Sequence, residues 1–258
     1  MNQKILYAAV GLVVGALAGF FFATAADRKE LQTLQSQVAR SGEKAGAQKG
    51  VDDARAQSPQ SSASPAMPTQ QEIRDIIAKA DARADDANYQ REVGQGVYMY
   101  SLAQGDPALM PEAVRLLKRA LQADPKNYQT TLLLGNAHFA LGQEGDAKKY
   151  EEARGYYQKA LETKPDDPNL HALLGMTYYF GSPSDPQRAI TEYRKSLAKD
   201  PQHEMALQNI ASVLIATGAT REAEQHISEL EKINPNNNAL SNLRAQLEQA
   251  KNAGGGRK

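Results

Sequence analysis

A phrase of small and large apolar positions recurs four times between residues 113 and 235. An alanine is followed after four residues by a large apolar residue, after seven by a small or apolar residue, and after twelve by proline. Positions three and four apart share one face of a helix, and the residue before a proline disfavours helix. Each phrase therefore predicts a helix that ends near its proline. The copies begin at Ala113, Ala153, Ala189 and Ala223 and end at Pro125, Pro165, Pro201 and Pro235.

Another helix is predicted upstream of each phrase, with a small residue near its centre. That residue is Gly135 in the second unit, Gly175 in the third and Ala211 in the fourth. In the first unit the pattern fits best as Val93, Gly96, Val97 and Tyr100, which puts Val97 at this place, and Gly94 gives a competing register. A small residue is expected because two helix backbones cross there, and a bulky side chain would force them apart. The near-constant spacing of these units predicts a repeat array.

Helix, turn, helix with these residues at these places resembles the tetratricopeptide repeat. The resemblance covers about residues 89–237 and rests on Leu134–Gly135, Leu174–Gly175, the four alanines and the four prolines. It implies an all-α fold, a right-handed α-solenoid of about four helix-turn-helix repeats. An uninterrupted repeat has about 34 residues, and the first three units carry extra residues between their two helices.

The resemblance also implies a concave groove, lined by the first helix of each unit, that binds a protein or peptide segment. Chaperone-binding members hold a carboxylate there, using an asparagine just after the matched glycine and a lysine three residues before it. Asn136 matches the asparagine, but Leu132 stands in the lysine place. We therefore expect an apolar and aromatic groove, although some of its residues could instead pack between units. The candidate groove residues are Arg91, Tyr98, Asn136, Phe139, Met176, Tyr179, Phe180, Ser212 and Ile215, with Ser101 beside Tyr98.

Residues 1–26 contain an uncharged apolar run, Ile5 to Thr24, that is long enough to cross a bilayer as a helix. Its glycines recur every four residues on one face, which would let two such helices pack closely. The alternative is a cleavable signal peptide, since Ala23-Thr24-Ala25 fits a cleavage site. We expect a single-pass membrane protein with an extracytoplasmic, periplasmic body, although the flanking Lys and Arg residues favour the opposite orientation. The glycines are Gly11, Gly15 and Gly19.

Between the anchor and the repeats, the composition predicts two further segments. Residues 27–44 form a helical stalk with one short apolar seam, and residues 45–68 form a disordered linker rich in Ala, Ser, Gln and Pro. Thr69 and Glu72 make a capping box that starts a helix to about Ala84. The repeat domain spans 69–253 and includes a capping helix at 239–251, followed by a flexible tail at 254–258.

Composition and charge exclude several classes of function. There is no cysteine, and 30 basic residues balance 30 acidic ones, so we expect neither thiolate metal sites nor nucleic acid as a partner. His138 and His171 occupy core positions of the repeat, while His203 and His226 fall on polar faces. The paired carboxylates and the basic cluster at Arg115, Lys118, Arg119 and Lys126 fit solvated surfaces. We therefore predict no enzyme activity, no cofactor and no metal.

These observations together predict a membrane-tethered scaffold that binds another protein through its groove. One alternative is an oligomerising structural component of a cell-envelope complex, joined through Gly11, Gly15 and Gly19 as a homo-oligomer. Within the first class, the layout is similar to that of the bacterial accessory proteins of cytochrome c maturation, which hold apocytochrome in a membrane-anchored repeat domain.

Overall fold

The computed structural model of the protein describes residues 68–255. The predicted anchor, stalk and nearly all of the linker lie outside this range, as do Gly11, Gly15 and Gly19. Within the described range, none of the helices combines the length and the apolar character needed to cross a membrane. The residues from Gln70 onward form one compact unit.

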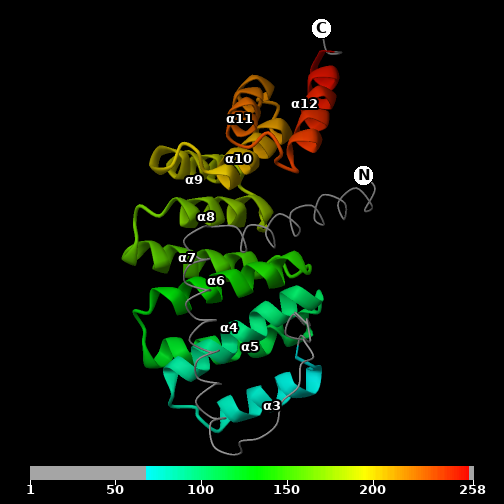
Figure 1. Ribbon diagram of the computed structural model, residues 1–258. Coiled ribbons are helices and arrows are strands. Elements are labelled where there is room, and N and C mark those ends of the chain that lie inside the picture. The colour runs from blue at the N-terminus through cyan, green and yellow to red at the C-terminus, as the bar shows by residue number, and fades with distance from the viewer. Residues whose placement is uncertain (1–67, 256–258) are drawn as a thin grey trace, which may run out of the picture. The chain divides into compact units, whose positions relative to one another are not determined.

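The described part of the chain is all-α and consists of stacked helical pairs (Figure 1). The predicted division into four units is confirmed, with one helix before them and one after. The pairs are α4 (Ala87–Gln104) with α5 (Met110–Ala123), α6 (Tyr128–Gln143) with α7 (Lys149–Thr163), α8 (Pro168–Phe180) with α9 (Pro186–Lys199), and α10 (Glu204–Ala216) with α11 (Thr220–Ile233). The flanking helices are α3 (Gln70–Asp81) and α12 (Leu240–Gly255), and a short 3-10 turn, η1 (Pro107–Leu109), precedes α5.

Each second helix ends where the phrase predicts. The last residues of α5, α7, α9 and α11 stand two positions before their prolines. The residue preceding a proline is pushed out of the helical region, so the helix stops one residue earlier. The extra residues of the early units lie between their helices, as expected, but they also lengthen the first helices. The first helix has 18 residues in α4 and 16 in α6, against 13 in α10.

The small residues mark the points where paired helices cross. A Cβ atom added at Gly135 would lie 2.5 Å from a ring carbon of Tyr157, and one at Gly175 would lie 2.6 Å from the ring of Tyr193. In the first unit, a Cβ atom at Gly94 would lie 2.9 Å from Leu117, whereas one at Gly96 would meet nothing within 4 Å. The register expected first, with Val97 at this place, was therefore wrong, and the competing register with Gly94 is correct.

The first helices share a capping position eight residues before the matched small residue. Asp86, Asn127, Asp167 and His203 stand there, and each side chain accepts a hydrogen bond from a backbone amide in the first turn of its helix. Such caps satisfy amides that have no partner within the helix. The expectation that His203 falls on a polar face was wrong, because the residue is only 6% exposed.

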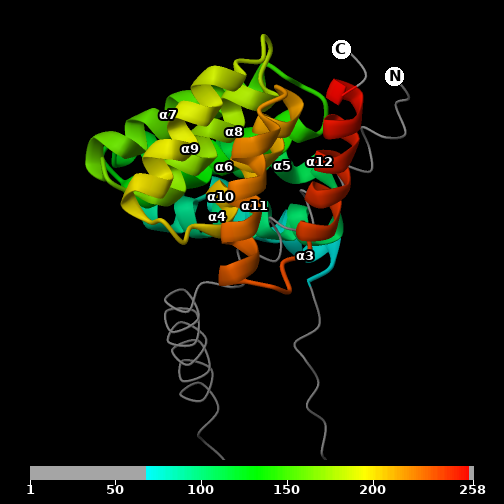
Figure 2. The ribbon, with the colours of Figure 1, turned by 90° about the horizontal axis from the view of Figure 1, so that it is seen from above.

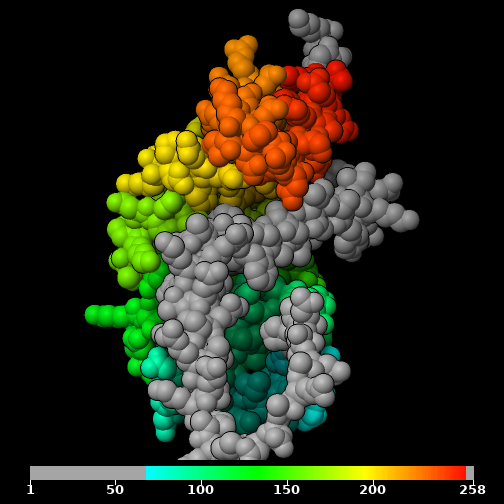
Figure 3. All heavy atoms as spheres, in the orientation of Figure 1, coloured from blue at the N-terminus to red at the C-terminus, as the bar shows by residue number. Residues whose placement is uncertain are grey.

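Helices α3 and α12 close the two ends of the array. Helix α3 buries Ile73, Ile77 and Ala80 against α4 and ends at Asp81, three residues before the predicted end. Helix α12 buries Leu240, Leu243 and Leu247 against α10 and α11, as predicted for a cap, and continues to Gly255, inside the predicted tail. In space-filling view, α10, α11 and α12 meet without a visible break (Figure 3).

The buried side chain of Gln90 joins α3 to the first unit. Its Nε2 donates to the carbonyl oxygens of Ala80, at 2.5 Å, and Arg83, at 3.0 Å, where α3 ends. We expect Gln90→Leu to lower the free energy of unfolding by about 1 kcal/mol, because each carbonyl keeps one backbone donor but loses the amide. Urea unfolding followed by circular dichroism measures this. Gln95→Leu, at a half-buried position of the same helix, is the matched control, and equal losses in both would contradict the assignment.

Between units, the most extensive contacts join each second helix to the first helix of the next unit, and some first helices also contact one another. Helix α4 packs on α6, α8 on α10 and α10 on α12, while each second helix packs on the first helix of the next unit. This asymmetry places the first helices on the inner side of the stack. Seen from above, α7 and α9 lie together at one side of the array and α12 at the other (Figure 2).

Candidate functional site

The Gly94 register defines which side chains the first helices align along the array. Positions one and four residues after the matched small residue hold Gln95 and Tyr98, then Asn136 and Phe139, then Met176 and Tyr179, then Ser212 and Ile215. Ser101 does not belong to this series: it is buried, and its hydroxyl donates to the backbone carbonyl of Asp106. The same register places Arg91 three residues before Gly94 and Gln95 one residue after it.

Burial divides the nine candidate residues into two groups. Contact between these residues and a ligand stays a prediction. Only the less buried group has accessible surface that a ligand could contact without rearrangement of the protein. Among the large apolar side chains of the described range, Leu102 is exposed, at 39%. The first helices in this range therefore carry no broad exposed apolar patch. The buried candidates are Tyr98, Asn136, Phe139, Met176 and Ile215, and the half-buried ones are Arg91, Tyr179, Phe180 and Ser212.

Asn136 is already engaged within the second unit. Its Oδ1 accepts a hydrogen bond of 2.9 Å from the hydroxyl of Tyr157, which is fully buried. Burial raises the pKa of Tyr157 well above its ordinary value, so the hydroxyl keeps its proton and acts as the donor. In the third unit, the corresponding residues are Met176 and Tyr193, and the buried hydroxyl of Tyr193 has no hydrogen-bond partner among the described residues. The side chain of Asn136 is therefore hydrogen-bonded within the buried core of the second unit.

An aromatic cluster links the second and third units. The ring of Phe139 lies edge-on to Tyr150, with centroids 5.1 Å apart, and Tyr150 stacks with Phe180 at 6.1 Å. Tyr179 adds an edge contact to Phe180 at 5.1 Å. Burial raises the pKa of Tyr150 to about 12. Sequence reasoning missed Tyr150, which follows the extra residues of the second unit and packs over Gly142.

Arg91 is a cation on the inner side of the first unit. Its side chain is 24% exposed, and its nearest carboxylate, on the largely exposed Glu92, is 3.7 Å away. Arg154, nearer the aromatic cluster, is held differently: its Nη2 donates to the carbonyl of Thr177 at 2.8 Å, and the guanidinium lies over the ring of Tyr178. Arg91 is therefore better placed than Arg154 to bind an anionic group of a ligand.

Two residues of the predicted basic cluster, Arg115 and Arg119 on α5, are paired with carboxylates. Arg115 and Arg119 both contact Asp81 of α3 at 2.5 Å, and Arg115 also contacts Glu112. Hydrogen bonds from the two guanidinium groups lower the pKa of Asp81. These partly exposed pairs fit the expected solvated surface.

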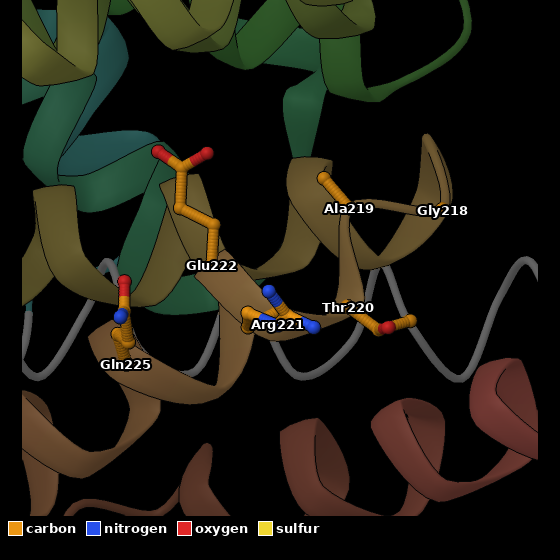
Figure 4. A pocket seen from close by; sticks show the side chains of 6 residues that line it. All are labelled: Gly218, Ala219, Thr220, Arg221, Glu222 and Gln225. Atoms are coloured by element: carbon orange, nitrogen blue, oxygen red, sulfur yellow. The ribbon is translucent and has the colours of Figure 1, made fainter.

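A shallow depression of about 570 Å³ lies at the turn between α10 and α11 (Figure 4). Its side chains point in different directions, and Glu222 is paired with Arg194 of the preceding unit at 2.7 Å. Polar groups that bind a small molecule converge on it, so this surface lacks the geometry of such a site. The residues that line it are Gly218, Ala219, Thr220, Arg221, Glu222 and Gln225.

Among the described residues, the histidines belong to no group of three side chains that could hold a metal ion. His138 is buried and stacks on Tyr156, and burial lowers its pKa to about 4. His171 lies 2.8 Å from Glu192 and 3.2 Å from the carbonyl of Pro165. Both occupy the interior positions that the repeat pattern predicts.

Comparison with known proteins agrees with this geometry. Two family models, both described as tetratricopeptide repeat, match residues 102–168 and 183–247, which together span just over half of the chain. The chain belongs to the tetratricopeptide repeat family.

One relative of this tetratricopeptide repeat protein is the probable biofilm formation methyltransferase WspC of Pseudomonas putida KT2440. The two are 34% identical over 87 residues, which is 34% of this chain and 19% of the relative. The match thus covers about a fifth of that protein.

Solved structures share the fold at low identity. MamA from Desulfovibrio magneticus RS-1 superposes with a TM-score of 0.53 at 16% identity, covering 66% of this chain and 87% of MamA. YrrB, described as a tetratricopeptide repeat protein with an unusual peptide-binding site, gives 0.51 at 15% identity over 71% of this chain and 85% of its own. At these identities the likeness establishes the fold alone.

Proposed function

We propose that this protein is a scaffold without catalytic activity that binds a segment of another protein along its first helices. Support comes from the side chains that remain accessible there. Arg91 and Gln95 stand one helical turn apart on α4, and the half-buried Tyr179, Phe180 and Ser212 follow along α8 and α10. A peptide could place an acidic group against Arg91 and apolar side chains against the aromatic residues.

The observation that carries the proposal is the position of Arg91. In the Gly94 register, Arg91 and Gln95 occupy the places that hold a lysine and an asparagine in the chaperone-binding members of the tetratricopeptide repeat family. In the second unit, Leu132 stands in the lysine place, which argued against binding of a carboxylate. In the first unit, a cation and an amide stand at the two corresponding places. The preferred ligand therefore changes from a wholly apolar segment to one with a carboxylate beside an apolar stretch.

Charge reversal at Arg91 tests this function. A fluorescent peptide selected from an array of apolar segments ending in acidic residues serves as the probe. We expect Arg91→Glu to weaken its binding by about tenfold or more, because a guanidinium–carboxylate attraction becomes a repulsion. Lys118→Glu makes the same charge change on an exposed position of α5 and is expected to alter affinity less than about twofold. Circular dichroism confirms that both variants fold, and equal affinities in both would refute the role of Arg91.

Membrane tethering through residues 1–26, with the body outside the cytoplasm, belongs to the same proposal and is supported by the sequence of that segment. A tether would hold the repeat domain near membrane-bound partners. Homo-oligomerisation through Gly11, Gly15 and Gly19, and a role in cytochrome c maturation, stay predictions from sequence.

A further inference from the structure

The first helix of the fourth unit is capped differently from those of the other three. At the shared capping position, the earlier units carry Asp86, Asn127 and Asp167. The fourth carries His203, whose side chain changes charge nearest to neutral pH. All four residues cap the first helix of their unit. The three caps of the earlier units can therefore be compared directly with the histidine cap.

Both ring nitrogens of His203 are used by its neutral form. Nδ1 accepts a hydrogen bond of 3.2 Å from the backbone N–H of Ala206, and this bond caps α10. Nε2 lies 2.9 Å from Oδ1 of Asn169, near the start of α8. Nδ1 must be unprotonated to accept, so the proton of the neutral ring is on Nε2, which donates to Asn169. One imidazole thus caps its own helix and ties it to the preceding unit.

A second proton on this ring would remove the cap. It would bind Nδ1 and point at the N–H of Ala206, so two donors would face each other at the positive end of a helix. Three carboxylates favour the charged form of the ring: Asp200 at the end of α9, Asp167 at the start of α8 and Glu204 within α10. Burial opposes them and has the larger effect, so the pKa of His203 is lowered.

We propose that His203 makes the joint between the third and fourth units sensitive to pH. At neutral pH the ring fixes α10 to α8. As the pH falls below the ordinary imidazole pKa of about 6.5 and toward the lowered pKa of His203, protonation releases the cap and loosens the start of α10. A histidine whose pKa is lowered by folding contributes stability above its unfolded value, and this contribution declines as the pH falls below it. The inference concerns the stack itself and does not depend on peptide binding.

Amide hydrogen exchange in the full chain tests the proposal. After correction for the intrinsic effect of pH, we expect exchange at Ala206 to rise by about fivefold to tenfold between pH 7.5 and pH 5.5, the scale of one lost helix cap. The amide of Thr130, capped by Asn127, is the internal control and should stay level. No rise at Ala206, or an equal rise at Thr130, would overturn the proposal.

Two variants distinguish protonation of His203 from protonation of another histidine. His203→Asn restores a cap that does not titrate, so the rise at Ala206 should disappear, whereas His226→Asn, at a half-buried position of α11, should behave as the parent chain does. A rise that persists in His203→Asn would overturn the proposal. The imidazole nitrogen shifts of the parent chain add a test that needs no variant: Ala206 exchange and His203 protonation must share one midpoint, and separate midpoints would refute the link.

Discussion

Gly135→Ala is expected to lower the free energy of unfolding by about 2 kcal/mol, although alanine is the better helix former. The new Cβ atom would lie 2.5 Å from the ring of Tyr157, which is fully buried and hydrogen-bonded to Asn136. Neither the ring nor the helix can move without disturbing the crossing of α6 and α7. Urea unfolding followed by circular dichroism measures the loss.

Gly96→Ala is the matched control within the first unit. A Cβ atom there meets nothing within 4 Å, so the substitution should raise stability by up to about 1 kcal/mol through helix propensity. Gly94→Ala, two residues away, should instead lower it, because its Cβ atom would lie 2.9 Å from Leu117. If Gly96→Ala were the more damaging of these two, the crossing point assigned to the first unit would be wrong.

Tyr157→Phe is expected to lower the free energy of unfolding by about 2 kcal/mol. The substitution removes only the hydroxyl, so the ring continues to fill the space over Gly135. It leaves Oδ1 of Asn136, a buried acceptor, without the donor that lies at 2.9 Å in the native chain. Leaving a buried polar group unpaired costs more than the net value of the hydrogen bond that is lost.

Tyr193→Phe makes the same change at the equivalent position of the third unit and should have the opposite consequence. The hydroxyl of Tyr193 is buried with no partner among the described residues, and Met176 replaces the asparagine. Removing it should leave stability unchanged or raise it by up to about 1 kcal/mol. Equal losses in Tyr157→Phe and Tyr193→Phe would show that the ring environments, not the hydrogen bond, control the effect.

The helical repeat could be predicted from sequence because its signals are local. A proline stops a helix through its own geometry, and small residues at helical spacing mark one face wherever the chain goes. The choice between the two registers of α4, with Gly94 or Val97 at the crossing point, is different, since both fit its spacing. The decision depends on Leu117, which approaches Gly94 only once α5 has packed.

The candidate site was less predictable because exposure is a property of neighbouring units. Counting from the matched glycine placed Phe139 on the inner side, but not the ring of Tyr150 that covers it from the start of α7. The sequence indicated that Asn136 could contact a ligand, but in the structure its Oδ1 accepts a hydrogen bond from the hydroxyl of Tyr157. His203 looked polar and exposed because it stands among charged residues, whereas its position eight residues before Ala211 marks it as a helix cap. The recurrence of Asp86, Asn127 and Asp167 at that position was the signal for this role.

Photo-crosslinking from the intact chain in its own cells tests the central claim, that the first helices form the partner-binding side. A photoreactive residue at Gln95 on α4 is compared with one at Gln158, an exposed position on α7. We predict a discrete protein adduct from position 95 that is lost when Arg91→Glu is added, and none from position 158. Adducts that form equally from position 158, or that persist unchanged with Arg91→Glu, would contradict the account.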